Sequence, residues 1–459
     1  MTESTSSPLS MAKLGQTIES GHVDTVLVVF TDMQGRLQGK RVHARYFLDT
    51  VMDQGMEGCN YLLAVDVDMK TVSGYDISSW EQGYGDFLIK PDMSTLRAAP
   101  WLPGTVMVQC DLSWLDGTPV RQSPRQVLQA QIREANELGC VPFGATELEF
   151  IVFNTTYQEA HQSNFEGLEA STRYNVDYSI LGTSGDEPLI RDIRNTMYNA
   201  GLTVESSKGE CNLGQHEVIF KYERVLTTAD NHVVFKTAAK ELASRHGKSL
   251  TFMSKFDERE GNSCHIHMSL RGVDGSLVFA EERNSEFSDG RSPIFKSFVA
   301  GVLATLRDFT LLYAPTINSY KRFRADSFAP TAIAWGEDNR TCALRVVGTD
   351  AGLRVENRVP GGDVNPYLAQ AAMLAGGLFG IRASLPLEGA FVGNAYESDL
   401  ARIPTTLRQA RDTFADSELA KSAFGEDVVA HYVRAADVEL EAYDSVVTDW
   451  ERRRGFERF

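Results

Sequence analysis

Ionisable side chains alternate with apolar ones inside several short segments that otherwise have the composition of buried strands. In residues 146–153, Glu147 and Glu149 are two positions apart, and leucine, phenylalanine and valine occupy the alternate positions. Side chains two apart in a strand point to the same face, so the two carboxylates share one face. The same alternation occurs in residues 264–270 and 353–359, whose polar positions are His265, His267 and Ser269, and Arg354, Glu356 and Arg358. These segments predict strands with one apolar and one ionisable face.

Carboxylates this close together in an apolar run repel one another unless a cation lies between them. A fourth segment, residues 208–217, contains a glycine-containing loop that brings Glu210 and Glu217 to the beginning of a predicted strand. Taken singly, each segment is also compatible with a structural salt bridge, a core histidine or a solvated strand edge. Together they form a set of mostly carboxylates with one or two imidazoles, which suits a hard divalent cation. Zinc would draw on cysteine or more histidine, so magnesium or manganese is the expected ion.

A group of cationic side chains lies further along the chain. Its members come from three segments: Lys321, Arg322 and Arg324; Arg340 and Arg345; and Arg358. Arginine forks match carboxylate and phosphate oxygens two at a time. Metal-binding carboxylates beside several arginines meet the needs of phosphoryl transfer, in which metals and guanidinium groups neutralise the charge. For the arginines alone, a solvated basic surface is the alternative.

The usual nucleotide-binding signatures do not occur in the sequence. Residues 35–41, GRLQGKR, have three residues between the glycines instead of four and lack Ser or Thr after the lysine, so they are not a phosphate loop. No GxGxxG opens a helix after a strand, and there is no GxSxG. An ATP site in this chain therefore requires another architecture.

Charge and cysteine content exclude several classes of function. The 459 residues contain 45 Lys and Arg against 62 Asp and Glu, a net charge of −17, so no nucleic acid or anionic membrane is expected as a partner. The six cysteines include no CxxC pair, which favours a reduced, cytoplasmic compartment. The start of the chain lacks a signal-peptide pattern, and the apolar stretch 371–381 is too short to cross a membrane. That stretch predicts a buried helix, with glycines that allow a neighbour to approach closely.

Turn-rich segments divide the chain into a small and a large unit. Residues 1–20 are expected to form a tail and a short helix, and residues 21–115 a small sheet-containing domain that begins with a hairpin. Residues 116–459 alternate strands with helices, which predicts an α+β domain. The expected strands there are 144–153, 217–222, 264–270, 343–347 and 353–359, and the expected helices are 125–138, 189–200, 228–246, 294–314, 367–385 and 419–443.

Eight short motifs follow one another along the chain. They are residues 90–95 (KPDMST), 147–150 (ELEF), 214–217 (GQHE), 228–231 (TADN), 265–267 (HIH), 318–322 (NSYKR), 339–341 (NRT) and 354–358 (RVENR). In these motifs and their order, the chain resembles the type I glutamine synthetase family from about residue 24 to its C-terminus. The resemblance implies a small N-terminal β-grasp domain and a large catalytic α+β domain with a curved antiparallel sheet. It also implies a homo-oligomer, a dodecamer of two hexameric rings with active sites between neighbouring subunits.

The resemblance also implies roles for particular residues. By their place in the motifs, the family's metal, nucleotide and substrate positions fall on these residues: Glu149, Glu210 and Glu217 for one metal; Glu147, His265 and Glu356 for a second; Tyr222, His267 and Ser269 beside the nucleotide; Arg340 and Arg345 on the transferred phosphate; Arg322 and Arg358 on glutamate and its phosphorylated intermediate. The implied enzyme uses ATP as co-substrate and two or three Mg²⁺ or Mn²⁺ ions per site. Its reaction is attack of the L-glutamate γ-carboxylate on ATP, giving γ-glutamyl phosphate and ADP, then displacement of phosphate by an amine.

Two departures from the family pattern concern the ammonium pocket. Where the family ends its flap with Glu-Ala-Pro, this chain has Phe328-Ala329-Pro330, and the family's FDGSS segment appears as residues 56–60, MEGCN, with Glu57 as a partial substitute for the aspartate. Loss of a carboxylate weakens binding of a small cation, and a phenylalanine can pack against the carbon chain of a larger amine. The sequence therefore predicts a γ-glutamyl-amine ligase acting on ethanolamine or a polyamine, with ethanolamine favoured.

Two other interpretations remain open from the sequence. The first is a glutamine synthetase that still uses ammonium with a modified flap. The second is a non-catalytic paralogue with a structural or nitrogen-sensing function, although all six matched metal positions hold competent ligands. Regulation by adenylylation is not expected at Tyr396, because the Asn-Leu-Tyr of the family's loop is replaced by Asn394-Ala395-Tyr396.

Overall fold

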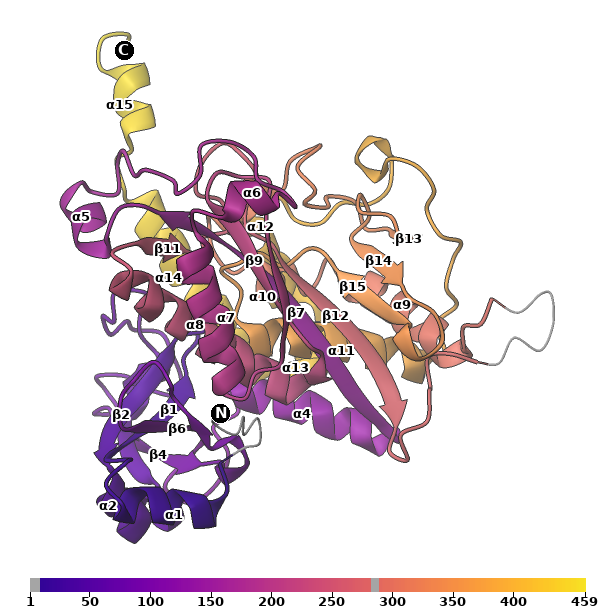
Figure 1. The fold of residues 1–459 in the computed structure, drawn as a ribbon. Helices are drawn as coiled ribbons and strands as arrows, with labels where there is room; N and C mark the ends of the chain where they lie inside the picture. The colour runs from indigo at the N-terminus through magenta and orange to yellow at the C-terminus, as the bar shows by residue number, and fades with distance from the viewer. Residues whose placement is uncertain (1–8, 282–288) are drawn as a thin grey trace.

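Two β-sheets, far apart in sequence, organise the chain (Figure 1). The computed structural model describes residues 9–281 and 289–459, so most of the predicted N-terminal tail lies outside the described residues. The smaller sheet forms from the N-terminal part of the chain, at the lower left of Figure 1, and the larger one runs through the centre with helices around it. The fold is α+β, as the sequence predicts.

The N-terminal sheet is mixed. Among the described residues its strands lie in the order β2 (Leu37–His43), β1 (Thr25–Thr31), β6 (Thr105–Ser113), β4 (Asp86–Pro91) and β3 (Met56–Cys59), with β5 (Arg97–Ala98) beside β6. β1 and β2 form the predicted hairpin, whereas β1 and β6 run parallel. A parallel central pair flanked by antiparallel strands fits the β-grasp expected for this part of the chain.

The larger sheet carries the segments in which polar and apolar residues alternate. In the described chain its order is β13 (Trp335–Glu337), β14 (Leu344–Val347), β15 (Arg354–Asn357), β12 (Cys264–Gly272), β7 (Cys140–Phe153), β9 (Gln215–Phe220) and β8 (Val204–Gly209), with β10 (Glu223–Arg224) and β11 (Ser249–Thr251) also paired to β7. The expected antiparallel arrangement is wrong at one edge. There β13 and β14 run parallel, because residues 338–343 carry the chain back instead of forming a hairpin.

Helices complete both units. In the described residues they are α1 (Met11–Glu19), α2 (Ala44–Tyr46), α3 (Met52–Gln54), α4 (Pro124–Glu137), α5 (Tyr157–Gln162), α6 (Ile180–Thr183), α7 (Glu187–Asn199), α8 (Val225–Arg245), α9 (Pro293–Thr305), α10 (Thr310–Tyr313), α11 (Pro366–Ala383), α12 (Leu407–Asp416), α13 (Glu418–Phe424), α14 (Glu426–Asp444) and α15 (Asp449–Gly455). None of the helices that the structure describes combines the length and apolar character needed to cross a bilayer.

Helix α8 determines which face of β7 is buried in the core. The ring of Phe150 on β7 lies 6.2 Å from the ring of Phe235 on α8, and His232 of the same helix contacts Thr146. Because side chains alternate along a strand, packing of this face against α8 turns Glu147 and Glu149 to the opposite face. The apolar half of the alternating pattern therefore fixes where the ionisable half points.

Two predicted helices are each interrupted. The expected helix 294–314 ends at Thr305, whose hydroxyl donates to the carbonyls of Gly301 and Val302 and competes with the main-chain ladder. The expected helix 419–443 is divided into α13 and α14 by Gly425, which has a φ of +93°. Such a backbone angle is readily adopted by glycine and stops the helical pattern.

The predicted close approach of helices at the glycines of α11 is confirmed. A Cβ added at Gly377 would lie 2.0 Å from the ring of Phe298 on α9, and one added at Gly380 would lie 2.0 Å from the carbonyl oxygen of Ser297. Glycine is therefore required where these two helices cross beneath the larger sheet.

A buried arginine joins the N-terminal sheet to helix α8 of the larger unit. Arg125, near the start of α4, donates to Asp92 at 2.8 Å and Asp111 at 2.6 Å in the N-terminal unit, and to Asp230 of α8 at 3.0 Å. The hydroxyl of Tyr367 donates to the same Asp230 carboxylate at 2.6 Å. The guanidinium thus satisfies carboxylates from both units, which accounts for the motifs at residues 90–95 and 228–231.

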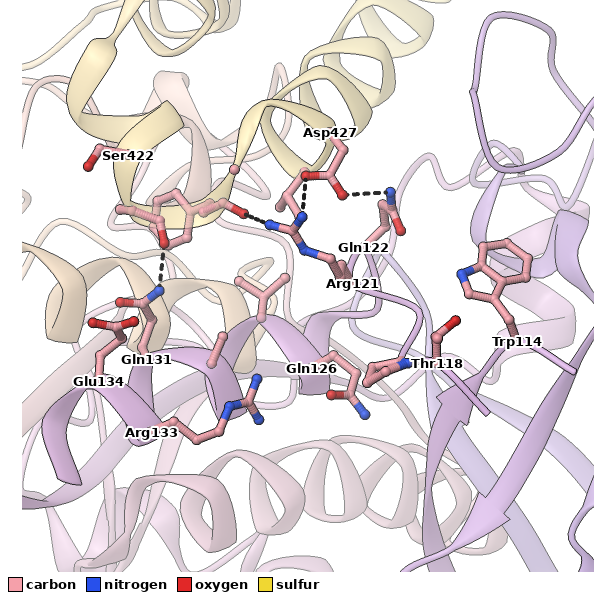
Figure 2. Close-up of a pocket in the computed structure, with 17 residues that line it drawn as sticks. Trp114, Thr118, Arg121, Gln122, Gln126, Gln131, Arg133, Glu134, Ser422 and Asp427 are labelled. Atoms are coloured by element: carbon pink, nitrogen blue, oxygen red, sulfur yellow. Dashed lines mark hydrogen bonds and ion pairs between the residues drawn. The ribbon is translucent and has the colours of Figure 1, made fainter. Parts of the chain in front are cut away.

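Polar contacts also tie the start of α4 to the C-terminal helices. Figure 2 shows Arg121 and Gln122 reaching the two oxygens of Asp427 on α14, each at 3.3 Å. Further along α4, Gln131 donates to the carbonyl of Ala423 at 2.8 Å. The pocket between these helices contains none of the residues predicted to act in catalysis or binding.

Replacing Arg125 by alanine should destabilise the fold severely. The substitution leaves the buried Asp230 carboxylate without its main partner, and loss of one member of a buried ion pair costs about 3–5 kcal/mol. Denaturant unfolding followed by tryptophan fluorescence measures the change. The matched control is Arg382→Ala, which removes an exposed ion pair with Glu134 between α11 and α4 and should cost less than about 1 kcal/mol. Equal effects of the two substitutions would contradict the bridging function of Arg125.

Candidate active site

The strand register places the ionisable side chains in one band across the larger sheet. Residues paired across neighbouring strands present their side chains on the same face. Five such pairs succeed one another from β8 to β14: Lys208 with Glu217, Glu217 with Glu149, Glu147 with His265, His267 with Glu356, and Glu356 with Arg345. Side chains from six strands therefore meet on the face opposite α8.

One end of the band combines two carboxylates and two imidazoles. The Nδ1 atom of His265 lies 3.5 Å from Glu147 Oε2 and 3.4 Å from Glu356 Oε1, so the three residues predicted for one metal are in contact. His267, predicted to lie beside the nucleotide, also reaches Glu147, with Nε2 2.9 Å from Oε1. One ligand atom from each of Glu147, His267 and Glu356 lies within 4.8 Å of the other two. Both histidines are therefore placed to take part in metal binding.

The other end of the band is a group of three carboxyls, of which Glu149 and Glu217 are buried and Glu210 is partly buried. Burial and the neighbouring Glu210 raise the pKa of Glu149 to about 8. Burial, and then the charges of Glu147, Glu149 and Glu210, raise the pKa of Glu217 well above its ordinary value. The raised pKa values mean that Glu149 and Glu217 are difficult to ionise without a cation beside them. A bound cation would relieve this repulsion.

The donor set fits a hard divalent ion. Burial and the charge of Arg358 lower the pKa of His265 to about 4, so its imidazole is neutral at physiological pH, as a metal ligand must be. Its Nε2 atom is buried and has no hydrogen-bond partner among the described residues. Glu149 uses one oxygen to accept from the backbone N–H of Ser263 at 2.7 Å. No hydrogen bond within the described parts of the chain reaches its other oxygen, which is left for a further ligand.

Two of the predicted arginines converge on Glu356. Arg345 donates to one oxygen of this fully buried carboxylate at 2.8 Å, and Arg358 donates to the other at 2.6 Å. Burial opposes ionisation of Glu356, but His265 and Arg358 outweigh it and lower its pKa to about 2. Arg345 also pairs with Asp338, a contact that the sequence did not indicate. Both guanidinium groups are thus held at the edge of the candidate metal site.

The other two arginines differ from each other in accessibility. Arg340 is exposed, and among the described residues its side chain makes no hydrogen bond or ion pair, so its guanidinium is available to an incoming phosphate. Arg322 is buried, and its donors are taken up by the carbonyls of Val359 and Arg358 and by the hydroxyl of Ser263. Burial lowers the pKa of Arg322 to about 10. In this structure it braces the backbone behind the carboxyls, and contact with substrate remains a prediction.

The three residues predicted to lie beside the nucleotide line one pocket. Tyr222, His267 and Ser269 share it with Glu147, so the pocket opens next to the candidate metal site. Phe143, which the sequence did not indicate, lies there too, as does Arg354, which the sequence placed on an ionisable strand face without a role at the nucleotide. The Phe143 ring meets the ring of Tyr222 edge to face at 6.1 Å, and Arg354 Nε donates to His267 Nδ1 at 3.2 Å. That bond leaves Nε2 of His267 turned toward Glu147.

The two residues predicted for the amine pocket lie in separate places. Phe328 is 57% exposed, has a φ of +57°, and accepts a hydrogen bond from Arg358 through its carbonyl at 3.3 Å. Glu57 lies on β3 of the N-terminal sheet, with its side chain exposed. Within one chain, no described contact joins the Glu57 side chain to the larger sheet. Its place in an amine pocket therefore depends on a neighbouring subunit and stays a prediction.

Lys208 and Asp177 are further site residues that the sequence did not single out. The ammonium of Lys208 contacts the Glu210 carboxylate and lies 3.2 Å from Asp177 Oδ1. The position of Lys208 two residues before Glu210 was a usable signal, since it marks the same face of the chain. Asp177 lies in a loop between short helices, and no sequence pattern indicated it.

Comparison with known proteins places the chain in a family. The model of the glutamine synthetase catalytic domain matches residues 121–455. A gamma-glutamylethanolamide synthetase, GlnA4, from Streptomyces coelicolor is 57% identical over 98% of this chain and 96% of that protein, and a glutamate–isopropylamine ligase from a Pseudomonas species is 36% identical over 96% and 97%. A solved chain of the GmaS/ADP complex in conformation 1 superposes with a TM-score of 0.84 at 27% identity, covering 97% of this chain and 100% of that one. The chain belongs to the glutamine synthetase family.

Proposed function

We propose that this chain is an ATP-dependent ligase that joins the γ-carboxylate of L-glutamate to an amine, with ethanolamine as the preferred amine. The observation that carries the proposal is the band of carboxylates and imidazoles across the larger sheet, bordered by arginines and by the pocket of Tyr222. The names of the relatives from Streptomyces and Pseudomonas support an amine as the nitrogen donor.

The reaction proceeds in two steps, phosphoryl transfer to glutamate and then displacement of phosphate by the amine. An oxygen of the γ-carboxylate attacks the terminal phosphorus of ATP, the bond to ADP breaks, and γ-glutamyl phosphate forms. The nitrogen of the amine then attacks the γ-carbonyl carbon, the bond to phosphate breaks, and the amine loses a proton. Two or three Mg²⁺ or Mn²⁺ ions held by Glu149, Glu210, Glu217, Glu147, His265 and Glu356 would supply charge neutralisation of the phosphates.

The chain's own residues bind and orient the reactants. Among the described residues the exposed guanidinium of Arg340 makes no hydrogen bond or ion pair, so it can bind the transferred phosphate, while Arg345 and Arg358 are held on Glu356. Such preorganised cations act where negative charge develops. Tyr222 and Phe143 offer aromatic surfaces to a base, with His267 and Ser269 in the same pocket. Phe328, on an exposed loop next to Arg358, supplies an apolar contact for the carbon chain of the amine.

The assembly is proposed as a homo-oligomer, a dodecamer of two rings. The proposal accounts for Glu57, which lies on the N-terminal sheet away from the band in its own chain and can complete an amine pocket only in a neighbouring subunit. A cytoplasmic location is proposed from the cysteine pattern of the sequence. Two alternatives, ammonium as the nitrogen donor and a non-catalytic sensor, are decided by the experiments below.

Phosphate release from ATP and glutamate should depend on the amine offered. We expect kcat/KM for ethanolamine to exceed that for ammonium by at least about tenfold, because the pocket has lost the flap carboxylate that holds a small cation. Putrescine, spermine and isopropylamine complete the panel, and mass spectrometry identifies each γ-glutamyl product. A preference for ammonium would support the glutamine synthetase alternative. No turnover with any amine would support the non-catalytic one.

Replacing Phe328 by glutamate should shift the selectivity toward ammonium. A carboxylate at this position restores attraction for a small cation and removes the apolar contact, so the ratio of kcat/KM for ammonium to that for ethanolamine should rise about tenfold. Phe165→Glu is the matched control, since Phe165 is also an exposed phenylalanine with positive φ, 61% exposed at +61°. An unchanged ratio in Phe328→Glu would remove Phe328 from the amine pocket.

Binding of Mn²⁺ should release protons at neutral pH. With a pKa of about 8, the Glu149 carboxyl is protonated at pH 7 without metal, and it must ionise to become a ligand. The affinity for Mn²⁺ should therefore rise as pH increases toward 8 and level off above it. Calorimetry in buffers of different ionisation enthalpy measures the protons released. Glu149→Gln should bind more weakly and with less pH dependence; an affinity independent of pH in the parent protein would contradict the assignment.

A further inference from the structure

Lys208 brings a positive charge into the candidate metal site. It lies near the end of β8, and its ammonium contacts the Glu210 carboxylate directly. In the register of β8 and β9 it is paired with Glu217, so its side chain lies on the face that carries the carboxyls. Two of the three residues proposed to hold one metal are therefore neighbours of an ammonium group.

The same ammonium has a second set of contacts on the solvent side. Its Nζ atom lies 3.2 Å from Asp177 Oδ1 and 4.3 Å from the centroid of the Tyr178 ring. Asp177 is partly exposed, with 35% of its side chain accessible, and Tyr178 is largely exposed. A carboxylate together with an aromatic face is a favourable environment for an alkylammonium. Lys208 is thus shared between an inner partner, Glu210, and outer partners in the 177–178 loop.

An ammonium and a divalent ion compete for Glu210. Both are cations, and their repulsion at a few ångströms inside a partly buried site outweighs what either would gain from sharing the carboxylate. Binding of the ion at Glu210 therefore requires the ammonium to move outward. Asp177 and Tyr178 already contact the ammonium on its solvent side and are placed to retain it.

We propose that Lys208 is an internal counter-ion that competes with the divalent ion for Glu210, and that Asp177 and Tyr178 hold its ammonium when the ion binds. The inference rests on the proposed metal site and adds a positioning residue to it. It explains why an acidic site carries a lysine: the ammonium neutralises the carboxyls of the metal-free chain and lowers affinity for the ion.

A different function for Asp177 makes the opposite prediction. Ligand atoms of Asp177, Glu210 and Cys211 lie within 4.8 Å of one another, so Asp177 is also placed as a possible direct ligand. If Asp177 bound the ion itself, removing its charge would weaken binding whether or not Lys208 were present. If it holds Lys208, its effect disappears once Lys208 is removed.

Titration of the full-length protein with Mn²⁺, followed by electron paramagnetic resonance of the free ion, tests the proposal. Lys208→Met should bind Mn²⁺ about tenfold more tightly than the parent, which corresponds to about 1.4 kcal/mol. Asp177→Asn should bind several-fold more weakly, because the displaced ammonium loses its outer partner. The double variant should match Lys208→Met within about twofold, as a double-mutant cycle requires for a residue acting through Lys208.

Two controls separate charge from structure. Lys208→Arg keeps the charge and should retain the weaker affinity of the parent, while Lys70→Met removes a lysine that pairs with Asp68 in the N-terminal unit and should change nothing. Equal or weaker affinity in Lys208→Met, or a further loss in the double variant, would overturn the inference and leave the metal site intact. Absence of Mn²⁺ binding in every variant and the parent would overturn the metal site and the inference together.

Discussion

Repulsion among carboxyls on one face of the larger sheet is the constraint on which the rest of the site depends. Glu149 and Glu217 are buried, Glu210 beside them is partly buried, and the charge of Glu210 raises the pKa of both other carboxyls. A fold gains nothing from such an arrangement in the absence of a cation, because desolvation and like charge both act against it. The sheet tolerates it because its other face is packed against α8 and because the strand register leaves these side chains no alternative direction.

Positively charged side chains from different parts of the chain offset the desolvation and repulsion of these carboxyls. At one end of the band, Arg345 and Arg358 keep Glu356 ionised even though it is fully buried. At the other end, the ammonium of Lys208 contacts the Glu210 carboxylate and opposes the rise in pKa that burial causes there, without cancelling it. Arg125 joins aspartates of the N-terminal unit to Asp230 on α8, the helix that packs against β7 of the larger sheet. Buried ion pairs that fix the packing behind the sheet suit a site for phosphoryl transfer, since its catalysis is mostly positioning and charge.

The sequence predicted regular elements well where the pattern was long and less well at their interruptions. The strands of residues 144–153 and 264–270 appear in the structure as β7 and β12, because alternation over many residues is a strong signal. The helix predicted for 294–314 is divided after Thr305, whose hydroxyl bonds to the preceding turn. The parallel pairing of β13 with β14 was also missed, since strand direction depends on how a loop crosses the sheet and not on the residues within the strands.

The sequence by itself determined which side chains could meet a metal, since the period of two in a strand places Glu147 with Glu149 and His265 with His267 on common faces. It also determined family membership, through an ordered series of motifs that the comparisons bear out. Only the tertiary structure decided what each charged group contacts. Arg322 donates to backbone carbonyls, Lys208 contacts the Glu210 carboxylate, and Asp177 contacts Lys208 from a loop. The physical reason is that the two-residue alternation along a strand fixes the face to which each side chain points. Which side chains meet across strands and loops depends instead on strand register and on packing between segments far apart in the chain.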